Sequence, residues 1–412
     1  MIDYQRHILA NGLTVVLHQD LTTPLVAVNI LYKVGSKNEI EDKTGFAHLF
    51  EHLMFGGSEN VPDFDSVVQN AGGENNAFTN NDLTNYYDIM PAENLEAALW
   101  IESDRMRSLN INQESLDVQK KVVLEEFKET CLNKPYGDLW HHLSDLSYKK
   151  HNYRWPTIGL VPEHIEQAQL EDVQSFFKNY YNPNNAVIVL AGKFDFENAL
   201  TLIDKWFGDI EGTDDSLHPT LDVEPDQDIF RHKVVKGSVP ASGLYLAFHM
   251  PERLHSDFCA YDILSDVFSG GRSGRFYQNL LKGTKMFSKI DAYITGSIDP
   301  GLFMVEAKLM EGADIKEATT VIWDELDKLK KEVIKEEELQ KIKNSLISSV
   351  CYSEVSIISK AINLAYYEML GDVGKINQQE EDIIKVTAED IKRVAISTFT
   401  KENCSEIHYL KE

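Results

Sequence analysis

Residues 170–190 have the sequence LEDVQSFFKNYYNPNNAVIVL, which predicts a helix, a polar turn and an apolar strand in that order. Near the other end of the chain, residues 388–410 repeat the order: a helical stretch that ends at Phe399, a polar turn, and strand-like residues 407–410. The matching order and spacing indicate that the chain contains two related halves. Each half is then expected to be a sheet with helices packed on it, which is an α+β fold.

The beginnings of the two halves support the same duplication. Strand-like residues 26–34 and 243–249 are each followed by a helical stretch that ends in a Gly-Gly pair, at residues 56–57 and 270–271. Residues 211–228 are rich in Pro and Asp and have no apolar period, as expected for a linker between domains. We therefore predict two homologous domains, each a mainly antiparallel sheet with helices packed on it, at residues 1–215 and 230–412, joined by a linker at residues 216–229.

The composition limits the class of protein. A chain of 412 residues with 43% hydrophobic residues can bury more than one core, and its net charge of -26 disfavours nucleic acid and anionic membranes as partners. No apolar run is long enough to span a membrane. The four scattered cysteines form no CxxC pair and favour a reducing compartment. We expect a cytoplasmic protein, or a periplasmic one if a signal sequence preceded this chain.

The chemistry is concentrated in residues 45–57, GFAHLFEHLMFGG. The apolar residues fall on one face of a helix, and His48, Glu51 and His52 fall on the other. Two histidines four residues apart can bind one metal ion, and a catalytic zinc has three protein ligands and one open position. Glu51 lies between them and can act as general base on a water molecule that the metal activates. The alternative is a solvated helix face with two histidines of no function.

A third ligand must come from another part of the chain. Residues 122–129, VVLEEFKE, are helical and acidic. Glu126 follows two valines by three and four residues and borders the buried side of that helix, whereas Glu125 and Glu129 share a face with Lys121 and should be solvated. Glu126 is therefore the predicted third ligand. The alternative is that this acidic helix only presents a face to water.

Between these two helices, residues 72–80 (GGENNAFTN) and 83–89 (LTNYYDI) flank a turn at Asn81 and Asp82, which predicts a β-hairpin. An exposed edge strand here could bind an extended peptide substrate by main-chain pairing, which tolerates many peptide sequences. The alternative is an ordinary hairpin with a polar turn.

Taken together, HLFEHLMFGG, GGENNAFTNNDLTNYY, VVLEEF and the duplicated halves resemble the pitrilysin-like inverzincins, a family of zinc metallopeptidases. The resemblance is to the short processing-peptidase type, which includes the beta subunit of the mitochondrial processing peptidase and bacterial homologues. It implies one Zn²⁺ per chain, and hydrolysis of peptides or unfolded segments held as an added strand in a chamber. The roles that it implies are zinc ligation by His48, His52 and Glu126, general base catalysis by Glu51, and substrate binding by Asn76, Ala77, Phe78 and Thr79.

The chain departs from the family pattern at a few positions. Gln119 stands where the family usually has a Glu that supports the site, and can still hydrogen-bond there. In the second half, Leu281 and Phe287 stand where active partners have an Arg and a Tyr that help to stabilise the reaction intermediate. The positions that match the HxxEH ligands hold Tyr261, Leu264 and Ser265, so no second site of this kind is expected.

These departures predict the partners. We expect the metal-bearing subunit of a heterodimer whose related partner supplies the missing Arg and Tyr. One alternative is a homodimeric peptidase in which other residues replace them. Another is a non-catalytic assembly subunit. Such subunits typically lack some of the metal ligands, whereas this chain has all three.

Overall fold

The computed structural model describes residues 1–213 and 220–412, which form two compact units. Neither unit is continuous in sequence, because residues 129–154 belong to unit 2 and residues 351–378 to unit 1. The predicted linker at residues 216–229 lies partly outside the described residues. Unit 1 consists of Met1–Lys128, Trp155–Leu221 and Cys351–Gln378, and unit 2 of Glu129–Arg154, Asp222–Val350 and Gln379–Glu412.

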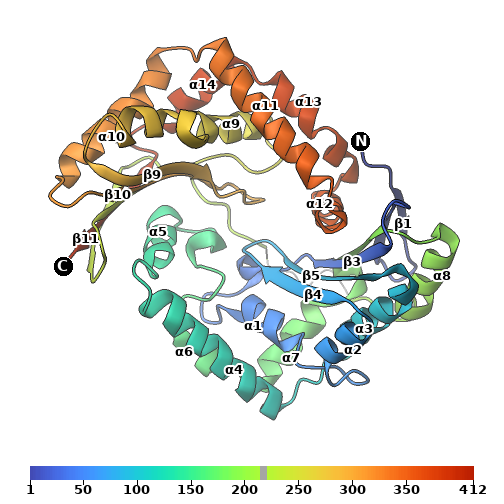
Figure 1. Cartoon of the computed structure of the whole chain (residues 1–412). Coiled ribbons are helices and arrows are strands. Elements are labelled where there is room, and N and C mark those ends of the chain that lie inside the picture. Colours follow the sequence, from blue (N-terminus) through green and yellow to red (C-terminus); the bar gives the residue numbers. More distant parts are fainter. Residues whose placement is uncertain (214–219) are drawn as a thin grey trace. The chain divides into compact units, whose positions relative to one another are not determined.

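Unit 1 is built on a six-stranded sheet with the order β1-β2-β6-β3-β5-β4 (Figure 1). Every neighbouring pair is antiparallel except β2 and β6, which are parallel. The strands are β1 (Gln5–Ile8), β2 (Thr14–Gln19), β3 (Leu25–Tyr32), β4 (Glu74–Thr79), β5 (Thr84–Pro91) and β6 (Ala186–Gly192). The helices are α1 (Phe46–Leu53), α2 (Phe64–Asn70), α3 (Leu95–Arg107), α4 (Gln113–Phe127), α6 (Pro162–Glu166), α7 (Leu170–Tyr180), α8 (Phe196–Phe207) and α12 (Ile357–Met369).

Helices cover both faces of this sheet, which explains the uninterrupted apolar run of β6. Ile188 and Leu190 pack on one face with residues of α1, α3, α7 and α8. Val187 and Val189 pack on the other face with Leu364 and other residues of α12. A strand buried on both faces needs apolar residues at every position, so the run does not alternate with polar residues.

Unit 2 has a five-stranded sheet with the order β7-β11-β8-β10-β9. Residues of α9, α10 and α14 pack on one face, and residues of α5 pack on the other. The strands are β7 (Arg231–Gly237), β8 (Gly243–His249), β9 (Phe287–Ile294), β10 (Leu302–Leu309) and β11 (Cys404–Lys411). The helices are α5 (Leu139–Ser147), α9 (Phe258–Ser269), α10 (Ile315–Lys331), α11 (Glu336–Ser353, ending in unit 1), α13 (Gln379–Lys385) and α14 (Ala388–Thr398).

The two sheets have the same topology, which confirms the predicted α+β fold with duplicated halves. The order β2-β6-β3-β5-β4 corresponds to β7-β11-β8-β10-β9, and in both sheets only the first of these pairs is parallel. The two stretches that indicated the duplication also match: α7 begins at Leu170 and leads to β6, and α14 begins at Ala388 and leads to β11.

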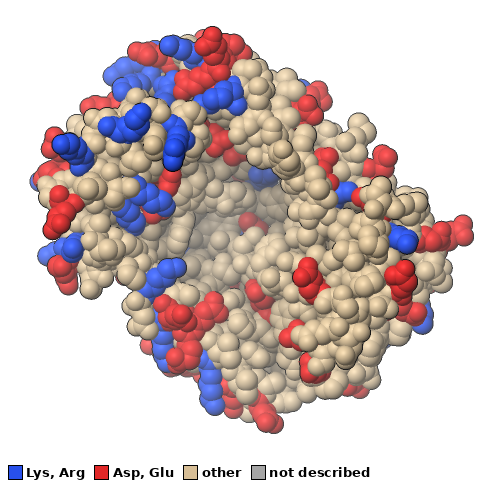
Figure 2. All heavy atoms as spheres, viewed as in Figure 1, with Lys and Arg blue, Asp and Glu red and all other residues tan. Residues whose placement is uncertain are grey.

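Charged side chains of both signs lie on the surface of unit 2. Figure 2 shows Lys and Arg side chains interspersed with Asp and Glu over α10 and α11 of unit 2. Within residues 1–213 and 220–412, no helix combines the length and apolar character needed to cross a membrane.

Candidate metal centre

Helix α1 spans Phe46–Leu53, inside the helical stretch expected from the sequence, and contacts of the preceding loop fix its first turn. Gly45, just before the helix, has φ 88°, a left-handed conformation that favours glycine. The backbone N–H groups of Gly45 and Ala47 donate to the buried carboxylate of Glu39, at 2.9 and 2.8 Å. Glu39 therefore occupies the position of a helix cap, although it lies well before the helix in sequence.

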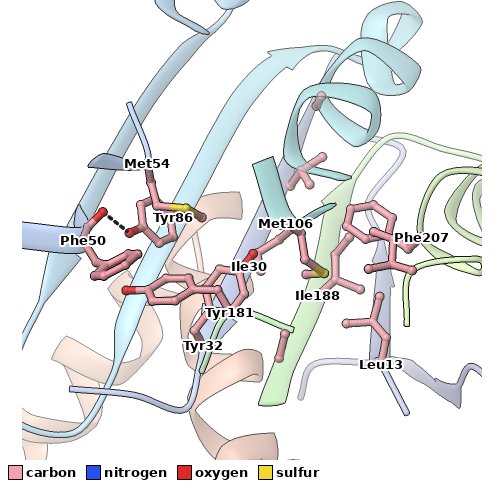
Figure 3. Packing of buried hydrophobic residues seen from close by; sticks show 14 of the residues in the cluster. Leu13, Ile30, Tyr32, Phe50, Met54, Tyr86, Met106, Tyr181, Ile188 and Phe207 are labelled. Atoms are coloured by element: carbon pink, nitrogen blue, oxygen red, sulfur yellow. Dashed lines mark hydrogen bonds between the residues drawn. The ribbon is translucent and has the colours of Figure 1, made fainter. Parts of the chain in front are cut away.

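The apolar face of α1 packs on an aromatic cluster, as the sequence pattern predicted. The Phe50 ring stacks on the rings of Phe176 and Tyr181, each with centroids 5.0 Å apart. The hydroxyl of Tyr86 on β5 donates to the Phe50 carbonyl at 3.5 Å (Figure 3). These contacts fix the rotation of α1 about its axis, so that His48, Glu51 and His52 lie on the side away from this cluster.

Helix α4 packs against α1 and carries Glu126 in its last turn. Its start is fixed by a capping box, in which Asn112 accepts from the Ser115 N–H and Ser115 accepts from the Asn112 N–H. Beyond Phe127 the helix widens into a π-helical turn at Lys128–Leu132. Such π-helical turns are frequent at functional sites.

The structure brings the three predicted ligands together. The Nε2 atoms of His48 and His52 lie 3.6 and 3.4 Å from Oε2 of Glu126. The ring centroids of His48 and His52 are 4.9 Å apart at an interplanar angle of 83°. Two ligands of a tetrahedral zinc with bonds of ~2.05 Å lie ~3.3 Å apart. The separations of these donor atoms therefore fit one shared Zn²⁺.

The electrostatics of His48 favour the form that binds a metal. Burial, with the neighbouring His52 as the second cause, lowers the pKa of His48 to about 4. Its ring is therefore neutral at pH 7 and offers a nitrogen lone pair. Its other nitrogen, Nδ1, is buried and has no hydrogen-bond partner among the described residues. Glu51 is not part of the group of converging ligand atoms, in keeping with a base rather than a ligand.

The predicted hairpin is present beside the candidate metal ligands. Strands β4 and β5 pair antiparallel, and the Asn80 N–H donates to the Leu83 carbonyl across the turn. In the described part of the chain β4 is an edge strand, with only β5 as neighbour. An open depression of about 280 Å³ lies between this strand and the helices, and residues that line it include His48, Glu51, Glu126, Ala77, Phe78 and Thr79.

Two other predicted residues, Asn76 and Gln119, are not among those that line the depression. Asn76 is on β4, where its side-chain Oδ1 accepts from the Ala77 N–H. Gln119 is half-buried on α4, two turns before Glu126 and on the same side of the helix.

Sequence reasoning missed three residues of this region. Thr157 and Ile158 line the depression from an irregular segment, for which no periodic pattern exists. Glu39 stands near Glu41 and Asp42 in the sequence, where no periodic pattern distinguishes one acidic residue from another. Only its hydrogen bonds to the start of α1 reveal its role.

In unit 2, the positions that correspond to the ligands are buried in an apolar core. Tyr261, Leu264 and Ser265 lie on α9, and Tyr261 accepts a hydrogen bond from the Thr398 hydroxyl. Leu281 ends a π-helical turn, and Phe287 is buried at the start of β9. Neither residue offers a polar group to a substrate.

Two family models match the chain. "Insulinase (Peptidase family M16)" matches residues 14–159, and "Peptidase M16 inactive domain" matches residues 167–346. The chain is 30% identical to the zinc protease PqqE of Helicobacter pylori over 98% of this chain and 91% of that protein. Unit 1 carries the HxxEH helix, and this helix lies within the residues that match the peptidase model. The chain belongs to peptidase family M16, which confirms the resemblance found in the sequence.

Two further comparisons support this assignment. A crystal structure of a protease from Helicobacter pylori superposes with a TM-score of 0.95 and 28% identity, and covers 100% of both chains. The beta subunit of the mitochondrial processing peptidase of Saccharomyces cerevisiae is 26% identical over 49% of this chain and 44% of that subunit. The similarity to PqqE and to the solved protease therefore extends over the whole chain.

Proposed function

We propose that this chain is a zinc metalloendopeptidase in which His48, His52 and Glu126 bind one Zn²⁺. The observation that carries the proposal is the convergence of two imidazole nitrogens and one carboxylate oxygen at separations that suit a tetrahedral zinc. Family membership and the relative named zinc protease PqqE support it. When bound, zinc supplies Lewis acidity that polarises a peptide carbonyl and lowers the pKa of water.

The other residues supply proton transfer and positioning. Glu51 lines the depression beside His48 and takes the proton of the attacking water as that water adds to the peptide carbonyl carbon. The same carboxyl group returns a proton to the leaving nitrogen as the C–N bond breaks. Gln119 supports the site from the same side of α4 as Glu126.

The substrate is an extended peptide or an unfolded segment. Ala77, Phe78 and Thr79 lie on edge strand β4 and line the depression, and Asn76 lies on the same strand. A peptide that adds to β4 as a further strand is held mainly through its main chain. Its scissile bond can then lie beside Glu51 with little dependence on peptide sequence.

We further propose that the active enzyme is a heterodimer. Leu281 and Phe287 supply neither of the Arg and Tyr groups expected in an active partner, so a related subunit must bring them. The relative in Saccharomyces cerevisiae is itself named as the beta subunit of a processing peptidase. Each subunit then provides one half of the substrate chamber.

The test compares Glu51→Gln with Glu125→Gln in cleavage of unstructured peptides, with added zinc and with the related subunit. Glu125 is a matched control, because its side chain is 73% exposed and pairs with the exposed Lys128. Glu51→Gln should lower turnover by about 10²- to 10⁴-fold and retain one zinc, while Glu125→Gln should match the native chain. Native turnover by Glu51→Gln would refute the catalytic role. Full turnover by this chain alone, with no stimulation by any related subunit, would refute the heterodimer.

A further inference from the structure

A second group of ligand-type side chains lies in unit 2, on the adjacent strands β7 and β11. It consists of His232 on β7 and of Glu406 and His408 on β11. One donor atom from each residue lies within 4.8 Å of the other two. The sequence pattern did not single out these residues, because the strands are far apart along the chain.

The sheet fixes this arrangement. Strands β7 and β11 pair in parallel, with His232 directly opposite Glu406. His408 follows Glu406 by two residues, so all three side chains point to the same face of the sheet. A metal bound there would be held by backbone that is already hydrogen-bonded in place.

The carboxylate of Glu406 is buried and incompletely satisfied. The side chain of Glu406 is only 5% exposed, and its Oε2 atom has no hydrogen-bond partner among the described residues. Its Oε1 atom lies 2.8 Å from Nε2 of His408, but His408 Nε2 also lacks a hydrogen bond of acceptable geometry. A buried carboxylate with an oxygen left without a hydrogen bond favours a cation bound close to it.

The two imidazoles are arranged as they are in the first site. The ring centroids of His232 and His408 are 4.6 Å apart at 85°, compared with 4.9 Å and 83° for His48 and His52. The 2.8 Å between Glu406 and His408 is about half an ångström less than the spacing of two zinc ligands, so these two side chains would separate slightly on binding.

One other cation competes for Glu406. The ammonium group of Lys401 lies 3.6 Å from Oε2 of Glu406, beyond hydrogen-bond distance, and 3.5 Å from the centre of the Phe230 ring. The Lys401 side chain is half exposed and flexible, so it can turn toward water when another cation arrives. Lys401 should therefore weaken metal binding without preventing it.

We propose that His232, Glu406 and His408 form a second metal site, for Zn²⁺ or a similar divalent transition metal. Two imidazole nitrogens with one carboxylate suit these metals, whereas Mg²⁺ and Ca²⁺ prefer oxygen ligands. The bound ion fastens edge strand β7 to β11 and stabilises unit 2. This proposal does not depend on the proposed peptidase activity.

The first experiment counts zinc per chain in the full protein after equilibration with Zn²⁺ and removal of unbound metal. The native protein should hold two zinc ions, and His232→Ala/His408→Ala should hold one. His48→Ala/His52→Ala should also hold one, and the variant that combines all four changes should hold none. His255→Ala is the control, since His255 is an exposed residue of the same unit, and it should hold two.

The outcomes separate the two sites. If the native protein holds one zinc and the His232/His408 variant still holds that zinc, the second site is refuted and the first stands. If His232→Ala/His408→Ala lowers the zinc count but His48→Ala/His52→Ala does not, the proposed catalytic site is refuted and the second site stands. His232 is exposed, so its replacement should not prevent folding, and His232→Ala alone should weaken the second binding event.

A second experiment uses Lys401→Met and calorimetric titration with Zn²⁺. Removing the competing ammonium group should tighten the second binding event about 30-fold, because a unit charge and a divalent ion ~4 Å apart in water repel twice as strongly as two unit charges. Because zinc binds the folded state, it should also raise the unfolding temperature of the native protein more than that of His232→Ala/His408→Ala. Unchanged affinity in Lys401→Met and equal temperature shifts in the two proteins would overturn the proposal.

Discussion

Replacing Glu39 by alanine should loosen the helix that carries His48, Glu51 and His52. Glu39 accepts hydrogen bonds from the buried N–H groups of Gly45 and Ala47. Leaving one buried N–H without a partner costs about 1 to 3 kcal/mol. The two groups together predict a loss of roughly 2 to 6 kcal/mol in unfolding free energy, with the lower end reached if water enters the space.

The assay is urea denaturation together with competition for Zn²⁺ by a chelator. Asp195→Ala is the matched control, because Asp195 caps α8 through the Asn198 N–H in the same unit but far from the ligands in sequence. It should lose about 1 kcal/mol and keep the native zinc affinity. Glu39→Ala should lose more stability and bind zinc about 10- to 100-fold more weakly, as when a supporting residue of a metal site is removed. Equal losses for the two variants, or unchanged zinc affinity in Glu39→Ala, would refute this role of Glu39.

The pH dependence gives a separate check on Glu39. Burial raises the pKa of Glu39 from 4.5 to about 8, despite the hydrogen bonds that favour the ionised form. The folded state therefore holds this proton more tightly than the unfolded state does. The stability from Glu39 is full below pH ~4.5, and it falls by at most ~1.4 kcal/mol per pH unit until pH ~8. Glu39→Gln should lack this slope in urea denaturation at pH 5.5, 6.5 and 7.5, and an identical slope would contradict the assignment.

Three further predictions follow from other parts of unit 1. Glu126→Gln should lower zinc affinity at least ~100-fold in a chelator competition assay. The metal-free protein should keep its stability, since the Glu126 side chain is 40% exposed. Glu125→Gln, measured in the same assay, should keep the native zinc affinity. Arg105→Ala should lower the unfolding free energy by about 3 to 5 kcal/mol in urea denaturation, because it leaves the buried Glu102 unpaired, and a loss below ~1 kcal/mol would contradict this. Residues 1–215 expressed alone should be insoluble or bind a dye for exposed apolar surface, whereas a cooperative unfolding transition of that fragment would contradict the need for α12.

Much of the fold could be predicted because local patterns and tertiary packing agree. The helix and strand of residues 170–190 were predictable because an amphipathic helix followed by an apolar run has few other solutions. The edge position of β4 agrees with its polar sequence, since Glu74–Thr79 has no fully buried residue. The sequence predicted that the two halves are related but not the order of strands in either sheet. That order depends on pairs such as β2 and β6, whose residues lie far apart in the chain.

The candidate site also contains residues that the sequence could identify and residues that it could not. His48, Glu51 and His52 were predictable because the helical period alone places them on one face. Glu126 was chosen from its spacing to two valines, but only the family resemblance favoured a metal ligand over an acidic helix face that is merely solvated. Glu39 could not be found from the sequence, because its role depends on a loop that folds back onto the start of α1.

The course of the chain between the two units determines when the metal centre can form. The sheet that supports α1 has an apolar face made by Val187, Val189 and Ala191, and α12 covers that face with Leu364 and Ala365. An amphipathic pattern shows that α12 needs an apolar partner but cannot show which sheet it covers. Because this cover lies in residues 351–378, unit 1 lacks part of its core until nearly the whole chain has been made. Contacts of such high sequence separation form late, since the intervening chain must lose entropy first. We therefore expect the site of His48, His52 and Glu126 to become rigid only after residues 222–350 of unit 2 have been synthesised, although all three residues lie in the first third of the sequence.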